Sequence, residues 1–138
     1  MSVEENKAIY RRFCEVWDKA EFDHFPEFLT PGFVMHMPRG DVAGIDALRQ
    51  VAEAGLAASA DRRTNLETLV GEGDMVVSRY TSEGTHTGDF QGIAPTGRKL
   101  SLQGFELVRF EGGRIAEVWG VRDELGLLQQ LGAMPGRG

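Results

Sequence analysis

The chain has 138 residues, of which 41% are hydrophobic, and we expect one domain spanning residues 1–138 around a single core. Fifteen basic against twenty-one acidic side chains give a net charge of −6, and no segment gathers Lys and Arg into a stripe, which argues against nucleic acid or a membrane as partners. A lone Cys14, no signal-like N-terminus and no apolar run of bilayer length predict a cytoplasmic protein.

The first half of the chain predicts helices. Its apolar residues Tyr10, Phe13, Cys14 and Trp17 recur at helical spacing, which predicts an amphipathic helix from Asn6 to Lys19. The pattern then predicts, in chain order, a short helical turn at His24 to Leu29, an interruption at Thr30-Pro31-Gly32, a short strand at Phe33 to Met37 and a helix at Ile45 to Ala58.

From Asn65 onward the pattern is typical of strands. The expected strands are Leu66 to Gly71, Met75 to Thr87, Leu100 to Phe110 and Arg114 to Arg122. Gly112-Gly113 predicts a tight hairpin, and Gly71 to Asp74 a similar turn, so the pairing is antiparallel. Helices first and strands last predict an α+β fold, in which a curved, mainly antiparallel four-stranded sheet wraps around the N-terminal helices into an open cone with a central apolar pocket.

Glu106 is the candidate base on these strands. It is the only ionisable group on its face of Leu100 to Phe110, and desolvation by apolar neighbours raises a carboxyl pKa toward the range where proton abstraction beside a carbonyl is effective. The alternative is a structural ion pair with a cross-strand arginine. The arginines available for such a pair are Arg79, Arg114 and Arg122.

Three segments carry a family resemblance: Gly84-Thr-His-Thr-Gly-Asp-Phe-Gln-Gly-Ile-Ala-Pro-Thr-Gly-Arg98, Trp119-Gly-Val-Arg-Asp123 and Leu127-Leu-Gln-Gln-Leu-Gly132. From about Asn6 to Gly132 the chain resembles the SnoaL-like polyketide cyclases, of the nuclear-transport-factor-like cone fold. The resemblance implies ring closure by intramolecular aldol condensation without metal or cofactor. The family places an acid/base aspartate directly after the position of Trp119, where this chain has Gly120, and a histidine at the position of Glu106.

Two further residues are candidates for acid/base chemistry. Asp123 precedes the apolar run of the C-terminal helix, so it either caps that helix or takes part in catalysis. His86 closes a strand beside the loop Gly88 to Arg98, which we expect to overhang the pocket mouth. It either donates to a substrate carbonyl or hydrogen-bonds that loop. Tyr80 shares its strand face and offers a hydroxyl to a carbonyl oxygen, or belongs to the core.

The expected ligand is a small hydrophobic molecule, bound in a cavity with few polar contacts. The residues expected to contact it are Phe13, Trp17, Tyr80, Leu102, Val108 and Gly120. Ile115 and Trp119 share a strand face with Val121, and this apolar face predicts a homodimer. Three scattered histidines and one cysteine predict no metal site, and the glycine-rich loop lacks the context of a nucleotide site.

Three functions fit these observations. The first is a cofactor-free cyclase, lyase or isomerase that moves a proton next to a carbonyl, with Glu106, His86 or Asp123 as acid and base. The second is a non-catalytic protein of the same fold that binds small hydrophobic ligands. The third is an epoxide hydrolase, which on this fold needs an Asp, Arg, Asp relay; Arg122 and Asp123 point to opposite faces if their strand continues.

Overall fold

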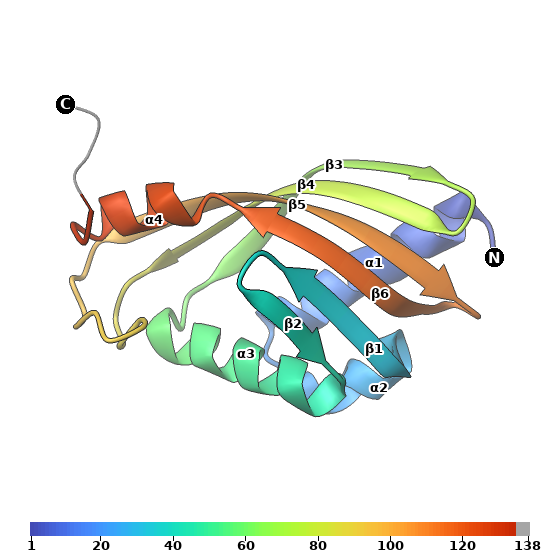
Figure 1. Cartoon of the computed structure of the whole chain (residues 1–138), viewed down its shortest axis with the longest axis horizontal. Helices are drawn as coiled ribbons and strands as arrows, with labels where there is room; N and C mark the ends of the chain where they lie inside the picture. The colour runs from blue at the N-terminus through green and yellow to red at the C-terminus, as the bar shows by residue number, and fades with distance from the viewer. Residues whose placement is uncertain (135–138) are drawn as a thin grey trace.

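The computed structural model describes residues 1–134, in which helices are packed against one face of a curved, open six-stranded sheet (Figure 1). The helical elements are α1 (Val3–Asp18), η1 (Phe22–His24), α2 (Phe25–Phe28), α3 (Ile45–Ala58) and α4 (Glu124–Gln130). The strands are β1 (Leu29–Met37), β2 (Gly40–Ala43), β3 (Arg63–Glu72), β4 (Met75–Thr85), β5 (Lys99–Glu111) and β6 (Arg114–Arg122). This arrangement confirms the predicted α+β class with a mainly antiparallel sheet.

The sheet has the order β2-β1-β6-β5-β4-β3. It contains two strands more than the predicted four-stranded sheet, because β1, predicted only as a separate short strand at Phe33 to Met37, joins the sheet and β2 was missed. β1 pairs in parallel with β6, and its register shifts between Leu29 and Val34, so Thr30-Pro31-Gly32 lies in an irregularity of the strand rather than before it. The expected four-stranded sheet was therefore wrong in number.

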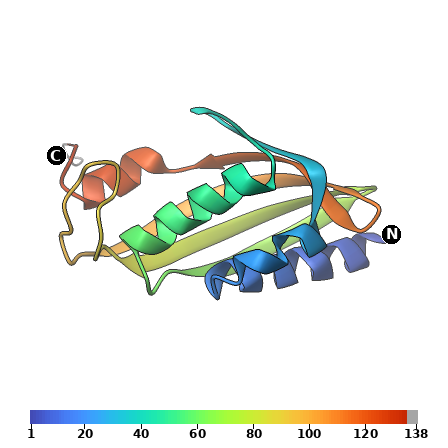
Figure 2. The ribbon, with the colours of Figure 1, turned by 90° about the horizontal axis from the view of Figure 1, so that it is seen from below.

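Local sequence accounts for the two long helices. Ser2 and Glu5 form a capping box at the start of α1, in which the Ser2 hydroxyl accepts from the Glu5 amide and the Glu5 carboxylate accepts from the Ser2 amide. The apolar stripe of α1 then faces the sheet, and α3 lies beside the same concave face (Figure 2). Arg62 donates to the carbonyl oxygens of Trp17 in α1 and Ala52 in α3. The two helices are thereby linked across that face.

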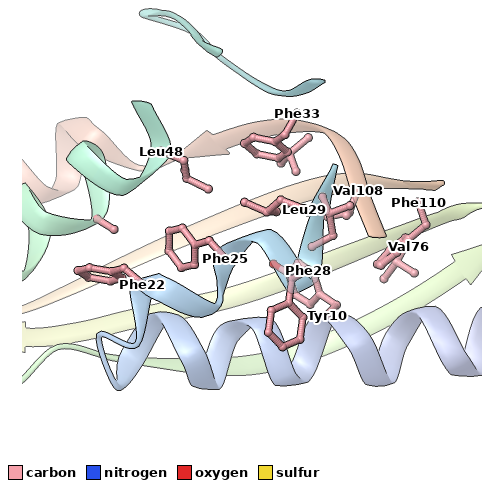
Figure 3. Close-up of a cluster of buried hydrophobic side chains, with 13 residues drawn as sticks. Tyr10, Phe22, Phe25, Phe28, Leu29, Phe33, Leu48, Val76, Val108 and Phe110 are labelled. Carbon is pink, nitrogen blue, oxygen red and sulfur yellow. The ribbon is translucent and has the colours of Figure 1, made fainter. Parts of the chain in front are cut away.

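The hydrophobic core lies between α1, α2 and one end of the sheet (Figure 3). Val76, Val108 and Phe110 from β4 and β5 are buried beneath Tyr10, Phe28 and Leu29. Burial of each such side chain stabilises the folded state by about 1.5–3 kcal/mol. The concave face is thus closed at this end of the strands. Further along β4 and β5, Tyr80 and Leu102 are only half-buried, so the concave face opens there.

Ile115 lies in this core and not on the outer face of the sheet, which corrects the sequence-based placement. Its side chain is only 1% exposed. Ile115 pairs with Phe110 and Glu117 with Arg109, so Ala116 is an extra residue in β6 that breaks the alternation of side chains. Trp119 and Val121 follow the bulge and do lie on the outer face.

Within residues 1–134, no helix is both long and apolar enough to cross a membrane.

Candidate functional site

Glu106 lies on the concave face at the middle of β5, directly between Ser78 of β4 and Gly120 of β6. The hydroxyl of Tyr10, from α1, donates to Glu106 Oε1 over 2.6 Å and lies 2.9 Å from the Ser78 hydroxyl. Tyr10 and Ser78 are buried, whereas Glu106 as a whole is half-buried. A helix and two strands therefore hold one oxygen of this carboxyl group in place. Among residues 1–134 no hydrogen bond to its other oxygen, Oε2, is recorded.

The surroundings of Glu106 raise its pKa. Burial of the carboxyl group is the largest cause, and it is opposed by the hydrogen bond from Tyr10 and by the positive charge of Arg122. The negative charge of Glu106 in turn adds to the burial that raises the pKa of Tyr10 and of Tyr80. Both phenols consequently remain protonated donors near neutral pH, on either side of a carboxyl group whose proton affinity is increased.

The alternative of a structural ion pair for Glu106 finds no support in the described part of the chain. Arg122 pairs with Glu124 at 3.2 Å, and Arg79 donates to Thr68. Neither they nor Arg114 forms a recorded ion pair with Glu106. Arg122 acts on Glu106 only through its charge.

Gly120 leaves the position beside Glu106 without a side chain, and Met37 of β1 fills it. A Cβ atom added at Gly120 would lie 2.8 Å from Met37 Sδ and 3.8 Å from Glu106 Cγ. The position at which the family resemblance implies an aspartate is therefore adjacent to Glu106, and in this chain a thioether occupies the space.

Asp123 caps α4. It accepts a hydrogen bond from the Gly126 amide at 2.9 Å, and its own amide donates to the Gln103 carbonyl. Its side chain is exposed and is not joined to Glu106 by any recorded bond. The structure thus places Asp123 in the capping role that was one of its two expected alternatives.

His86 holds the loop that follows β4. Its Nδ1 accepts from the Thr96 amide at 3.1 Å and lies 3.0 Å from the Thr96 hydroxyl, while its backbone bonds residues 97 and 98. The accepting Nδ1 places the ring proton on Nε2. His86 is 1% exposed, so the loop bond, rather than a place at an open rim, is what the structure shows.

The residues expected to line an apolar cavity are separated by the structure into two groups. Phe13 and Trp17 pack on Phe25, with ring centroids 5.4 and 6.0 Å away, and Val108 is fully buried in the core. Leu102 stays half-buried on the open part of the concave face, near Tyr80. Leu102 and Tyr80 thus lie outside the hydrophobic core cluster, against which Phe13 and Trp17 pack.

The opposite, outer face of the sheet carries an apolar hollow of about 400 Å³. Phe105, Trp119 and Val121 are 51%, 37% and 56% exposed there. The residues that line it from the outer face are Val77, Phe105, Leu107, Trp119 and Val121, with His36, Met37 and Pro38 at one side, and the strand positions of Glu106 and Gly120 lie between them. His36 stacks on Trp119 at its margin and contacts Asp41 and Glu117.

Comparison with known proteins identifies the family to which this chain belongs. Residues 7–131 match the family model described as SnoaL-like polyketide cyclase, so the chain belongs to that family. The resemblance inferred from the glycine-rich motif is thereby confirmed.

Individual relatives are similar along most of their length. Aklanonic acid methyl ester cyclase DnrD of Streptomyces peucetius is 32% identical over 132 residues, covering 90% of this chain and 88% of that protein. The structure of TsrD from Streptomyces laurentii is 28% identical with a TM-score of 0.88, covering 97% of this chain and 99% of that one. AclR from Streptomyces galilaeus, described as a candidate hydroxylase, is 29% identical with a TM-score of 0.90, covering 99% and 87%.

Three residues of the site were not singled out from the sequence. Tyr10 was assigned only to the apolar stripe of the first helix, although a tyrosine in such a stripe needs a partner for its hydroxyl. Ser78 and Met37 carried no distinguishing signal. Within residues 1–134 no group of three or more His, Cys, Asp or Glu side chains is placed to hold a metal ion.

Proposed function

We propose that this protein closes a ring in a small polyketide by intramolecular aldol addition, with Glu106 as the group that removes and returns the proton. The observation that carries the proposal is the Glu106 carboxyl group itself, fixed at Oε1 by Tyr10, with a raised pKa and a second oxygen directed to no recorded partner. Membership of the SnoaL-like polyketide cyclase family supports the reaction class.

The chemistry balances with one carboxyl group. Glu106 as carboxylate takes a proton from the carbon next to a substrate carbonyl, and the resulting enolate carbon attacks a second carbonyl carbon in the same molecule to form the ring bond. The oxygen of the attacked carbonyl takes the proton back from the Glu106 carboxylic acid. The product is an isomer of the substrate, and Glu106 ends as it began.

The substrate class follows from the relatives. Two proteins similar to this chain are named for the cyclisation of aklanonic acid methyl ester, DnrD of Streptomyces peucetius and DauD of Streptomyces sp. strain C5. We propose a flat, largely apolar polyketide ester of that kind. The half-buried Leu102 and Tyr80 on the open concave face would contact it, and the apolar walls would exclude water from the enolate.

The test uses aklanonic acid methyl ester with the wild-type protein and Glu106→Gln. We expect turnover by the wild type and a loss of about two to four decades in kcat in the variant, because glutamine keeps the shape and removes the proton acceptor. Glu67→Gln is the matched control, since Glu67 is exposed on β3, and should retain full activity.

Mass spectrometry of the product separates cyclisation from the hydroxylation suggested by the description of AclR. Cyclisation leaves the mass unchanged. A product heavier by one oxygen atom, or a fully active Glu106→Gln, would contradict the proposal.

The two alternatives of binding without turnover and of epoxide hydrolysis are not favoured. The described residues do not show the Asp, Arg, Asp relay required for hydrolysis, because Asp123 caps α4 and Arg122 pairs with Glu124. A protein that only binds its ligand does not need a carboxyl group with a raised pKa, such as Glu106, on the concave face.

We also propose a homodimer formed through the outer face. Phe105, Trp119 and Val121 form an exposed apolar centre, and the charged groups around His36 stand at its edge, which is the anatomy of a protein interface. The cytoplasm is retained as the proposed compartment, in keeping with Cys14 as a free thiol.

A further inference from the structure

The side chain of Tyr80 lies across the backbone of the neighbouring strand at Gly104. The two residues are partners in the pairing of β4 with β5, and Gly104 is in turn opposite Arg122 of β6. A Cβ atom added at Gly104 would lie 2.8 Å from Tyr80 Cε1 and closer still to its Cζ and hydroxyl oxygen. Any other residue at 104 would therefore displace the phenol ring.

The hydroxyl group of Tyr80 is free to bind a ligand. No hydrogen bond from it to another described residue is recorded, in contrast to Tyr10, whose hydroxyl meets both Glu106 and Ser78. The hydroxyl oxygen is also not completely buried. Because its pKa is raised by burial and by the charge of Glu106, the phenol is a donor and not an anion at neutral pH.

Tyr80 and Glu106 stand next to one another on the concave face. Tyr80 and Ser78 alternate on the same side of β4, and Ser78 is paired with Glu106. The Arg122 guanidinium acts on both groups through its positive charge. A donor, a proton acceptor and a cation thus surround one stretch of the open concave face, and the ring of Tyr80 covers Gly104 between them.

We propose that the Tyr80 hydroxyl donates a hydrogen bond to a carbonyl oxygen of the substrate, and that the carbon next to this carbonyl gives its proton to Glu106. Gly104 determines specificity, because its lack of a side chain leaves the space in which the phenol ring lies. When the proton moves to Glu106, negative charge develops on that oxygen, and the Tyr80 donor stabilises the enolate more than the ketone. This inference rests on the proposed function for the reaction, but the oxygen site itself is a claim about binding.

The catalytic test compares Tyr80→Phe, Gly104→Ala and their combination with aklanonic acid methyl ester. Loss of one donor to a developing oxyanion lowers kcat by about two to three decades, and we expect this for Tyr80→Phe with KM much less affected. Gly104→Ala should lower kcat in the same direction by displacing the ring. The kcat of the double variant should be no lower than that of Tyr80→Phe alone, because the hydroxyl is already absent.

A crowded glycine elsewhere provides the control. A Cβ atom at Gly71, near the end of β3 and opposite Val76, would lie 2.5 Å from Val3 Cγ1 in α1. Gly71→Ala should lower thermal stability and leave kcat unchanged. Independent, multiplicative losses of kcat from Tyr80→Phe and Gly104→Ala would overturn the role assigned to Gly104.

A binding experiment that needs no turnover keeps the inference separate from the reaction. The probes are 2-acetylnaphthalene and 2-ethylnaphthalene, which share a flat apolar shape and differ in the carbonyl oxygen. We expect the wild type to prefer the ketone, and Tyr80→Phe to lose this preference by about five- to tenfold, the value of one neutral hydrogen bond. Glu106→Gln should keep it.

The outcomes distinguish the two claims. A Tyr80-dependent preference for the ketone in a protein that turns over no polyketide ester would refute the proposed function and support the oxygen site. An equal preference in wild type and Tyr80→Phe, together with unchanged kcat of Tyr80→Phe, would overturn the inference and leave the proposed function standing on Glu106.

Discussion

The two faces of β4, β5 and β6 are built from alternate residues of the same strands, yet they differ in what covers them. On the concave face, α1 supplies a partner for the one carboxyl group, and Tyr10, Ser78 and Glu106 form a connected set. On the outer face, Phe105 and Trp119 remain exposed, and no helix or strand among residues 1–134 covers them.

The placement of charge differs in the same way. Glu106 is the acidic group of the concave site, and its pKa is raised because burial outweighs the nearby donor and cation. On the outer face Glu117 has a lowered pKa, chiefly because His36 bonds it, with Arg109 assisting. The two carboxyl groups therefore have pKa values shifted in opposite directions, because burial dominates at Glu106 and the bond from His36 dominates at Glu117.

The two proposals assign catalysis to one face of these strands and dimer formation to the other. One strand can do both, because its alternate side chains lie on opposite faces. Changes that reverse the character of one face should leave the other intact. The predictions below use that separation, beginning with the largest effect.

Trp119→Asp tests the outer face. A charge at the centre of an apolar interface has no partner and must be desolvated, so we expect dimer dissociation to become at least about a hundredfold easier. Sedimentation velocity across a concentration series measures the effect. Turnover by each subunit should remain, because Trp119 points away from Glu106. A wild-type protein that is monomeric at tens of micromolar, or a Trp119→Asp protein that stays dimeric, would contradict the proposed dimer interface.

Tyr10→Phe tests the concave face. Removing the hydroxyl leaves Glu106 without its donor and the buried Ser78 hydroxyl without the oxygen that accepts from it, at a cost of about 1–3 kcal/mol in the free energy of unfolding. The lost bond had lowered the pKa of Glu106, so the acidic limb of the kcat profile should move to higher pH. Ser78→Ala is the control, since it keeps the bond from Tyr10 to Glu106 and should not move that limb.

Glu106→Gln also separates the faces through the pH dependence of stability. The folded protein holds the Glu106 proton more tightly than the unfolded chain, whose carboxyl has a pKa near 4.5, so wild-type stability falls as pH rises from 4.5 through the raised folded pKa. The Glu106→Gln variant has no such loss of stability, because its amide does not titrate. The melting temperature of the variant minus that of the wild type should thus be more positive at pH 7 than at pH 4; a flat difference would show that the folded pKa is not raised.

Sequence patterns predicted the faces but not the contacts between distant elements. Helical spacing predicted the helix at residues 45–58, and the family resemblance, not alternation, related Glu106 to Gly120, which are partners in the pairing of β5 with β6. Ile115 was assigned to the wrong face, because alternation holds only where no extra residue such as Ala116 enters the strand. β2 has four residues on the edge of the sheet, too few to give a periodic signal.

The partner of Glu106 lies 96 positions away in the chain. Spacing showed that Tyr10 faces the interior, but not which strand residue its hydroxyl meets, since that depends on the angle and depth at which α1 packs. The same holds for Met37 over Gly120. Within residues 1–134, Arg122 pairs with Glu124 and not with Glu106, a choice between two acidic neighbours that alternation does not decide.

The smallest expected effect concerns Asp123, which lies between the end of β6 and the start of α4. Its carboxylate accepts from the Gly126 amide, which would otherwise be an unpaired donor in the first turn of the helix. Asp123→Ala should lower the free energy of unfolding by about 1 kcal/mol, whereas Asp123→Asn should change it little, because asparagine caps almost as well. Chemical denaturation measures both variants, and turnover should be retained in each. An Asp123→Asn protein with native stability and no activity would move the acid/base role from Glu106 to Asp123, and the concave face would then have to extend to the end of β6.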